Sequence, residues 1–157
     1  KGGVERFVVD LRNNPGGYFP GGVDVAKLFL REGDEIVFVT GRNGVEDEYQ
    51  QRFPPRFKEP LVVLVNKNTA SAAEILAGAL KDNGRATVVG EQTFGKGLVQ
   101  TLTELQDGSG VAVTISTYET PGHININKVG ISPDVKNACP IDVEDVVSCI
   151  PEDTVWR

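Results

Sequence analysis

Apolar runs separated by short polar turns predict alternating strands and helices along most of the chain. The segment Leu61-Val62-Val63-Leu64-Val65 is continuous and rich in β-branched residues, as expected of a strand covered on both faces. The predicted strands cover residues 6–11, 35–39, 61–65 and 86–90, and apolar positions at helical spacing predict helices over residues 23–30 and 72–82. This order indicates a mixed α/β fold in a single domain.

Two later segments, residues 98–105 and 111–118, alternate between apolar and polar positions and predict a pair of antiparallel strands. The residues between them include Asp107-Gly108-Ser109-Gly110, a typical hairpin loop. Residues 41–58 are polar, contain Pro54-Pro55 and hold few apolar anchors, so the pattern predicts no strand or helix there.

Ser71 lies where the predicted strand 61–65 gives way to a helix, a favoured place for functional sites in open α/β sheets. Ser71 and Glu74 also fit a capping box, in which the serine oxygen accepts from the third helical N–H and the glutamate reaches back. On these residues alone the cap is the better interpretation. The rest of the chain decides whether Ser71 is also a nucleophile.

Lys96 lies in a glycine-rich loop after the predicted strand 86–90. Residues 90–96, Gly-Glu-Gln-Thr-Phe-Gly-Lys, match the first seven positions of a phosphate-binding loop, so a nucleotide-binding module is one hypothesis. Against it, Gly97 stands where a Ser or Thr hydroxyl would hold magnesium. The next residues alternate like a strand, without the helix N-terminus that such a loop needs.

A loop lysine is most often exposed, but Gly95, Gly97 and Phe94 around Lys96 favour an amine covered by apolar surface. A covered lysine is a candidate base. Lowering a lysine pKa from about 10.4 to the useful range of about 7 to 8 costs about 4 kcal/mol of differential solvation, so this hypothesis requires burial of Lys96.

Composition narrows the possible functions. The 157 residues carry a net charge of −6 with no basic run, which argues against a nucleic-acid partner. No apolar run reaches the roughly 18 to 20 residues of a membrane span. Cys139 and Cys149, with His123 as the single histidine, do not complete a four-ligand zinc site, so they are two buried thiols or one disulfide. His123 follows Pro121-Gly122 and is interpreted as a surface turn residue.

A serine at a helix N-terminus, a glycine-flanked lysine 25 residues later and a glycine-rich turn after the first strand are the parts of a Ser-Lys hydrolase. In these parts the chain resembles the C-terminal processing peptidases, also called tail-specific proteases. The resemblance covers nearly the whole chain and rests on four motifs: residues 10–17 (DLRNNPGG), residues 65–66 with 69–74 (VN and TASAAE), residues 90–97 with Gln100 (GEQTFGKG), and residues 128–134 (KVGISPD).

The resemblance implies Ser71 as the nucleophile, Lys96 as the general base and Gln100 as the residue that orients the lysine amine. It also implies an oxyanion hole made of the backbone N–H groups of Gly17 and Ala72. The second donor agrees with the physics of a helix N-terminus, where the first-turn N–H groups lack partners and favour negative charge. Glu74 is near enough to Ser71 to help shape the site. No cofactor and no metal are implied.

The resemblance further implies a crotonase-like core of β-β-α units around a mixed sheet, with residues 1–157 as one catalytic-core domain. Full-length members also carry a PDZ domain and an N-terminal helical segment, neither of which is visible in this chain, so the chain is expected to be a piece of a longer protein. The implied partners are C-terminal tails of proteins or peptides, and the oligomeric state stays open.

The sequences of residues 125–128 (NINK) and 108–113 (GSGVAV) resemble those of the plant, algal and cyanobacterial branch of the family. Those enzymes process the precursor of the photosystem II D1 protein in the thylakoid lumen, so the chain is expected there or in a bacterial periplasm. A catalytically silent homologue that only binds or scaffolds remains an alternative, because the distance between two side chains is not written in the sequence.

Overall fold

A parallel sheet forms one layer of the molecule, which the computed structural model describes from residue 3 to residue 157. Its strand order is β1-β4-β5-β8, and each neighbouring pair is parallel. The strands are β1 (Phe7–Asp10), β4 (Leu61–Val65), β5 (Thr87–Gly90) and the short β8 (Val135–Lys136). All five residues of β4 are buried, which explains its unbroken apolar sequence.

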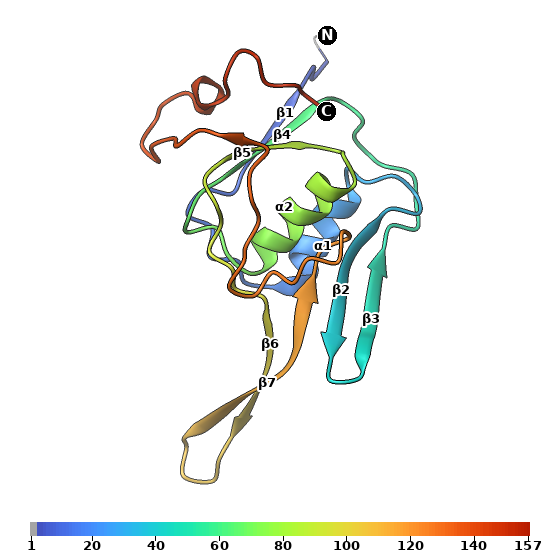
Figure 1. The fold of residues 1–157 in the computed structure, drawn as a ribbon, viewed down its shortest axis with the longest axis vertical. Coiled ribbons are helices and arrows are strands. Elements are labelled where there is room, and N and C mark those ends of the chain that lie inside the picture. Colours follow the sequence, from blue (N-terminus) through green and yellow to red (C-terminus); the bar gives the residue numbers. More distant parts are fainter. Residues whose placement is uncertain (1–2) are drawn as a thin grey trace.

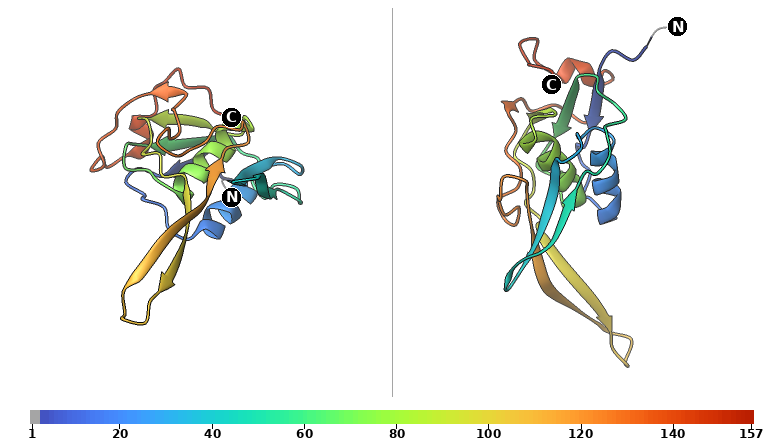
Figure 2. Two further views of the ribbon diagram at one scale, coloured as in Figure 1. Left: turned by 60° about the horizontal axis from the view of Figure 1, so that its bottom comes forward. Right: turned by 90° about the vertical axis from the view of Figure 1, so that its right-hand side faces the viewer.

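An antiparallel sheet with the order β3-β2-β7-β6 forms a second layer. Its strands are β2 (Glu35–Gly41), β3 (Gly44–Gln50), β6 (Leu98–Glu104) and β7 (Gly110–Glu119). The β6–β7 hairpin projects from the body of the molecule, and the views in Figures 1 and 2 agree on this. Only the base of the hairpin therefore contributes to the core.

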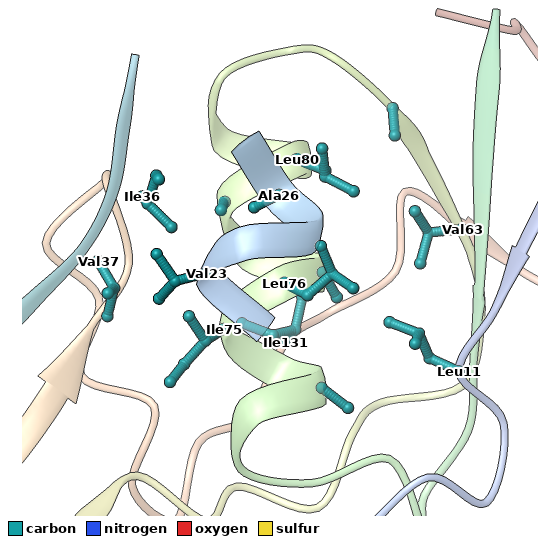
Figure 3. Packing of buried hydrophobic residues seen from close by; sticks show 14 of the residues in the cluster. Leu11, Val23, Ala26, Ile36, Val37, Val63, Ile75, Leu76, Leu80 and Ile131 are labelled. Carbon is teal, nitrogen blue, oxygen red and sulfur yellow. The ribbon is translucent and has the colours of Figure 1, made fainter. Parts of the chain in front are cut away.

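Two helices, α1 (Phe19–Lys27) and α2 (Ala72–Asp82), lie between the two sheets. Figure 3 shows Ile36 and Val37 of β2 on one side of the helices and Val63 of β4 on the other, with Leu76 between. Nine of the eleven α2 residues are buried, including its charged Glu74. α2 is thus surrounded, and its N-terminus is held in place by core packing on several sides.

The C-terminal segment covers the other face of the parallel sheet. Val62 and Leu64, which point away from the helices, pack in a second apolar cluster with Cys149 and Ile150, next to the short 3-10 helix η1 (Val146–Cys149). Cys139 and Cys149 form a disulfide in this cluster. The structure therefore selects the disulfide from the two alternatives that the sequence left open.

Most of the predicted elements are confirmed, with two differences. The polar segment 41–58 contains a complete strand, β3, whose side chains are mostly exposed, so it lacks the apolar alternation that marks a strand in a sequence. The predicted helix 23–30 is shifted: α1 begins at Phe19, four residues earlier, because Pro20 fits the first turn of a helix, and it ends at Lys27, three residues earlier. The mixed α/β class, with one parallel and one antiparallel sheet, is as predicted.

The structure opposes the nucleotide-binding hypothesis, since strand β6 and not a helix follows the loop of residues 90–97. Without that helix the loop has no helix N-terminus to hold a phosphate. No helix between residues 3 and 157 is both long enough and apolar enough to span a bilayer.

Candidate active site

Ser71 occupies a strained position between β4 and α2. Its backbone has φ 55° and ψ −124°, a region that a residue with a side chain rarely adopts, and α2 begins at the next residue. Such conformations cost about 1–3 kcal/mol and persist where the surroundings enforce them, often at functional sites. The side chain of Ser71 is half-buried.

The buried carboxylate of Glu74 organises this region. Its Oε2 accepts hydrogen bonds from the backbone N–H groups of Ser71 (2.8 Å) and Lys96 (2.9 Å). Its Oε1 accepts from the backbone N–H of Gly95 (2.7 Å) and from the hydroxyl of Thr93 (2.5 Å). One oxygen therefore bridges the backbones of Ser71 and Lys96, which lie 25 residues apart in sequence.

The Ser71–Glu74 pair has the arrangement of a capping box, and its glutamate half is the hydrogen bond just described. The N–H of Glu74 itself donates to the carbonyl oxygen of Ser71 at 2.8 Å. Because the backbone carbonyl of Ser71 already accepts the hydrogen bond of the Glu74 N–H, the cap does not depend on the Ser71 hydroxyl. Cap and nucleophile are compatible roles for this residue.

The glycine-rich turn after β1 packs directly against Ser71. A Cβ on Gly16 would lie 2.6 Å from the carbonyl oxygen of Ala70, 2.7 Å from Cβ of Ser71 and 2.9 Å from the backbone nitrogen of Ala72. The N–H of Ala70 donates to the carbonyl oxygen of Asn14 at 2.9 Å, which ties the two loops together. Gly16 is thus the residue of the turn that makes the close approach to Ser71.

Gly17, the donor expected from the resemblance, is exposed with φ 138° and open space around its Cβ position. Across the described chain from residue 3 to residue 157, neither its N–H nor that of Ala72 donates a hydrogen bond. The N–H of Gly16 is already used, since it donates to Oδ1 of Asn14 at 2.9 Å. Two unpaired donors therefore remain, Ala72 directly after Ser71 on the helix and Gly17 directly after Gly16 on the turn.

An ion pair between the buried Arg12 and the more exposed Asp10 lies directly before the turn. The Arg12 guanidinium makes two hydrogen bonds to Asp10, at 2.9 and 2.7 Å, and donates to the carbonyl oxygen of Pro140 at 2.5 Å. It also lies 3.0 Å from Sγ of Cys139, so the disulfide-closed segment is anchored to the residue that precedes the turn. Burial raises the pKa of Asp10, but the hydrogen bonds and charge of Arg12 outweigh it and hold that pKa below its ordinary value.

The expected cover over Lys96 is absent from residues 3–157. The Lys96 side chain is exposed, and Phe94, which was expected to cover it, is 65% exposed. Gln100 does not contact the amine either, since its side-chain nitrogen donates to Oγ1 of Thr114 at 3.2 Å, across the β6–β7 hairpin. Glu74 thus fixes the backbone of Lys96, while its amine has neither the burial nor the glutamine partner that the hypothesis requires.

An apolar cavity of about 250 Å³ opens next to Ala72, one of the two unpaired donors. Ala72 and Gly16 contribute to its wall. The remaining lining consists of five aliphatic residues (Val9, Leu11, Val25, Ala73 and Leu76) together with Asn14, Tyr18, Gly21 and Gly22. A larger cavity of about 460 Å³ lies near Gly84, beyond the other end of α2, and has no part in this site.

His123 is a surface residue, as expected. Its side chain is 64% exposed and lies 3.6 Å from a carboxylate oxygen of Glu119, while its ring stacks on Phe38. No group of three or more His, Cys, Asp or Glu side chains within residues 3–157 is arranged to hold a metal ion.

A family model described as "Peptidase family S41" matches residues 1–137. The chain belongs to peptidase family S41. Among curated S41 relatives, the "Carboxyl-terminal-processing protease" of Picosynechococcus sp. is 57% identical over 134 residues, which is 85% of this chain and 32% of that protein. The "C-terminal processing peptidase, chloroplastic" of Tetradesmus obliquus is 48% identical over 161 residues, which is 100% of this chain and 34% of that protein.

A solved structure described as "Photosystem II D1 C-terminal processing protease" matches the fold with a TM-score of 0.78 and 50% sequence identity. The match covers 86% of this chain and 35% of that one. The chain thus spans about a third of the length of these S41 relatives, and the family resemblance drawn from the four motifs is confirmed.

Two residues of the site are not singled out by the sequence. Thr93 and Gly16 stand there only as parts of motifs, and the resemblance assigns a role in the turn to Gly17 alone. Both Thr93 and Gly16 lie inside the four motifs, but what distinguishes them is a contact with a residue more than 15 positions away, which periodicity and turn rules do not reveal.

Proposed function

We propose that this chain is the catalytic core of a C-terminal processing peptidase, with Ser71 as nucleophile, Lys96 as general base and Gln100 as the residue that orients the amine. One observation carries the proposal: a single oxygen of Glu74 joins the strained Ser71 backbone to the Lys96 backbone. This bridge holds the backbones of Ser71 and Lys96 close together, which supports their assignment as a Ser-Lys dyad.

In the proposed reaction, neutral Lys96 takes the hydroxyl proton of Ser71 as Oγ attacks the scissile carbonyl carbon. The N–H groups of Gly17 and Ala72 stabilise the resulting oxyanion, and losing one such donor costs about 2.7–4 kcal/mol in comparable enzymes. The Lys96 ammonium then protonates the leaving amine, which departs and leaves an acyl-enzyme. Water, activated by Lys96 in the same way, releases the second product and regenerates Ser71.

The amine of Lys96 is exposed, so the working enzyme must cover it before it can act as a base. A lysine acts as a base only in its neutral form, which burial away from water favours. We therefore propose that the bound substrate, together with the remaining two thirds of the longer protein, covers Lys96 and brings Gln100 to its amine. Activity of residues 1–157 alone is expected to be weak or absent.

We propose protein C-terminal tails as the substrate, with an apolar side chain next to the cleaved bond seated in the 250 Å³ cavity. The similarity to a D1 C-terminal processing protease favours the photosystem II D1 precursor or a related protein. The thylakoid lumen of the chloroplast is the proposed location, with a bacterial periplasm as the alternative. The Cys139–Cys149 disulfide suits an oxidising compartment of either kind.

The finer description of the fold also belongs to this proposal. We propose a crotonase-like core in which residues 1–157 form one catalytic domain, with tail capture assigned to a PDZ domain elsewhere in the longer protein. The fold match to a processing protease at 50% identity covers 86% of this chain, which supports the part of the proposal that concerns the core.

A catalytically silent homologue is the second candidate, and two observations favour it: the exposed amine of Lys96 and the contact of Gln100 with Thr114. Such a protein would bind tails without cutting them. The structure of residues 90–104 speaks against the nucleotide-binding candidate, since β6 stands where its helix would be.

The deciding experiment uses the full-length parent protein and a folded test protein with a flexible, apolar C-terminal extension. Product masses are followed for the parent and for Ser71→Ala and Lys96→Ala, with Ser109→Ala and Lys58→Ala as exposed controls. The peptidase proposal is supported if the parent trims near the C-terminus and only Ser71→Ala and Lys96→Ala abolish the trimming. Binding of the extension without any trimming by the parent supports the silent homologue, and trimming by Lys96→Ala at the parental rate removes Lys96 as the base.

A further inference from the structure

Thr93 connects three separate parts of the candidate site. It is buried and lies three residues before Lys96, in the connection between β5 and β6. Its hydroxyl donates to Oε1 of Glu74 at 2.5 Å and accepts from the N–H of Ile131 at 2.6 Å. Its own N–H donates to the carbonyl oxygen of Ile131 at 3.1 Å. Thr93 is therefore bonded to α2 on one side and to residues 126–131 on the other.

The segment 126–131 packs on the Lys96 loop. The N–H of Lys128 donates to the carbonyl oxygen of Gly95 at 2.8 Å. A Cβ on Gly130 would lie 2.6 Å from the carbonyl oxygen of Thr93 and 2.8 Å from its hydroxyl oxygen. Because the contact tolerates no side chain at Gly130, the hydroxyl of Thr93 has little freedom to turn away from Glu74.

Among the four donors to the Glu74 carboxylate, Thr93 supplies the only side chain. The other three are backbone N–H groups, which a substitution leaves in place. The Thr93 hydroxyl and the Gly95 N–H hold Oε1, and holding Oε1 fixes the direction in which Oε2 faces Ser71 and Lys96. Without the hydroxyl, a buried and fully desolvated carboxylate loses one of the two hydrogen bonds at Oε1, and only the N–H of Gly95 still holds that oxygen.

We propose that Thr93 is a positioning residue of the peptidase reaction: its hydroxyl orients the Glu74 carboxylate, which sets the position of Lys96 relative to Ser71. This inference rests on the Ser71–Lys96 assignment proposed above. Displacing a reacting group by about 1 Å costs on the order of 100-fold in rate, so the orientation of one buried carboxylate is enough to matter.

The test compares Thr93→Val, which keeps the shape and removes the hydroxyl, with Thr93→Ser, which keeps the hydroxyl. Both are made in the full-length parent and assayed on the extended test protein over a range of substrate concentrations. Thr87→Val is the matched control, because Thr87 is another buried threonine, on β5, whose hydroxyl donates to the carbonyl oxygen of Val155 far from Ser71.

We expect Thr93→Val to lower kcat by about 10- to 100-fold while KM changes less than about threefold, since the groups that bind substrate stay in place. Thr93→Ser is expected to restore most of kcat, and Thr87→Val to leave kcat at the parental value. Unfolding midpoints are measured for all three, because a purely structural role would make Thr93→Val and Thr87→Val alike in both stability and rate.

Two outcomes overturn the proposal: parental kcat in Thr93→Val, or equal losses of kcat in Thr93→Val and Thr87→Val. Ser71→Ala and Lys96→Ala in the same assay separate this failure from a failure of the proposed function. If both are inactive while Thr93→Val works normally, only the role of Thr93 is wrong. If Lys96→Ala cleaves like the parent, the dyad itself is wrong.

Discussion

Replacing Gly16 with alanine should damage the candidate site more than its small size suggests. Two costs add at this position. The backbone of Gly16 has φ +87°, in the left-handed region where a Cβ costs about 1–2 kcal/mol. The new methyl group would also lie 2.7 Å from Cβ of Ser71 and 2.6 Å from the carbonyl oxygen of Ala70, closer than real Cβ atoms approach.

Relieving such overlap in a packed region typically costs about 1–3 kcal/mol. The sum predicts that Gly16→Ala lowers the free energy of unfolding by about 2–5 kcal/mol. The effect on catalysis has a separate origin. The methyl carbon would lie 2.9 Å from the nitrogen of Ala72, so it would crowd the space in which we propose that the oxyanion forms. A loss of about 100- to 1,000-fold in kcat is expected, as for removal of one oxyanion donor.

Gly33 offers a control with the same backbone and no clash. Its φ is +89°, and nothing lies within 4 Å of its Cβ position. Gly33→Ala therefore carries the conformational cost of about 1–2 kcal/mol without the contact cost. Urea unfolding of both variants of the full-length parent measures the two free energies, and cleavage of the extended test protein measures kcat.

The difference between the two variants isolates the contact of Gly16 with the residues around Ser71. If Gly16→Ala and Gly33→Ala unfold at the same urea concentration, the close approach of the turn to Ser71 is wrong. If Gly16→Ala keeps full kcat despite its lower stability, the space beside the Ala72 nitrogen is not where the oxyanion forms.

The remaining predictions concern the groups that hold the site. Glu74→Gln replaces one of the two carboxylate oxygens, each of which accepts two hydrogen bonds, with an amide NH₂. It should lower the free energy of unfolding in urea by about 1–3 kcal/mol and lower kcat. A parental kcat would mean that Glu74 has no bridging role. Cys139→Ser with Cys149→Ser should lower the unfolding free energy by about 2–3 kcal/mol, because the disulfide closes a short loop; an unchanged midpoint under oxidising conditions would contradict this. The lowered pKa of Asp10 means that its ionised form stabilises the fold above the ordinary carboxyl pKa. That stability should be lost as the pH falls through the lowered pKa, so thermal midpoints of the parent and Asp10→Asn should converge in acid; a gap independent of pH would oppose the pairing with Arg12.

The sequence sufficed for elements whose pattern is local. β4 is recognisable because every one of its residues is buried, and α2 because a capping pair precedes it and Asn83-Gly84 follows. β3 could not be found this way. Its seven residues are mostly exposed on an edge of the antiparallel sheet, and it is a strand because β2 offers hydrogen bonds, not because its own side chains alternate.

The individual residues of the candidate site could be predicted from the sequence, but the contacts between them could not. The motifs pointed to Ser71, Lys96, Ala72 and Gly17, since each lies at a turn or a helix start that has a recognisable local sequence. The exposure of Lys96 was not predictable, because cover over a loop residue comes from whatever packs on it from elsewhere. For the same reason the sequence could not show that Gln100 faces Thr114 across the hairpin.

Glu74 explains why the helix-cap and nucleophile interpretations of Ser71 do not exclude each other. In an ordinary capping box the glutamate serves only the helix, and an exposed carboxylate there would suffice. Here the carboxylate is fully buried and three of its four donors come from residues 93–96, so most of its hydrogen bonds hold the Lys96 loop and not the helix. A carboxylate needs several strong donors to be stable in a dry interior, and the loop supplies them. The helix start and the position of Lys96 are thus set by one group, and a change that loosens either must loosen both.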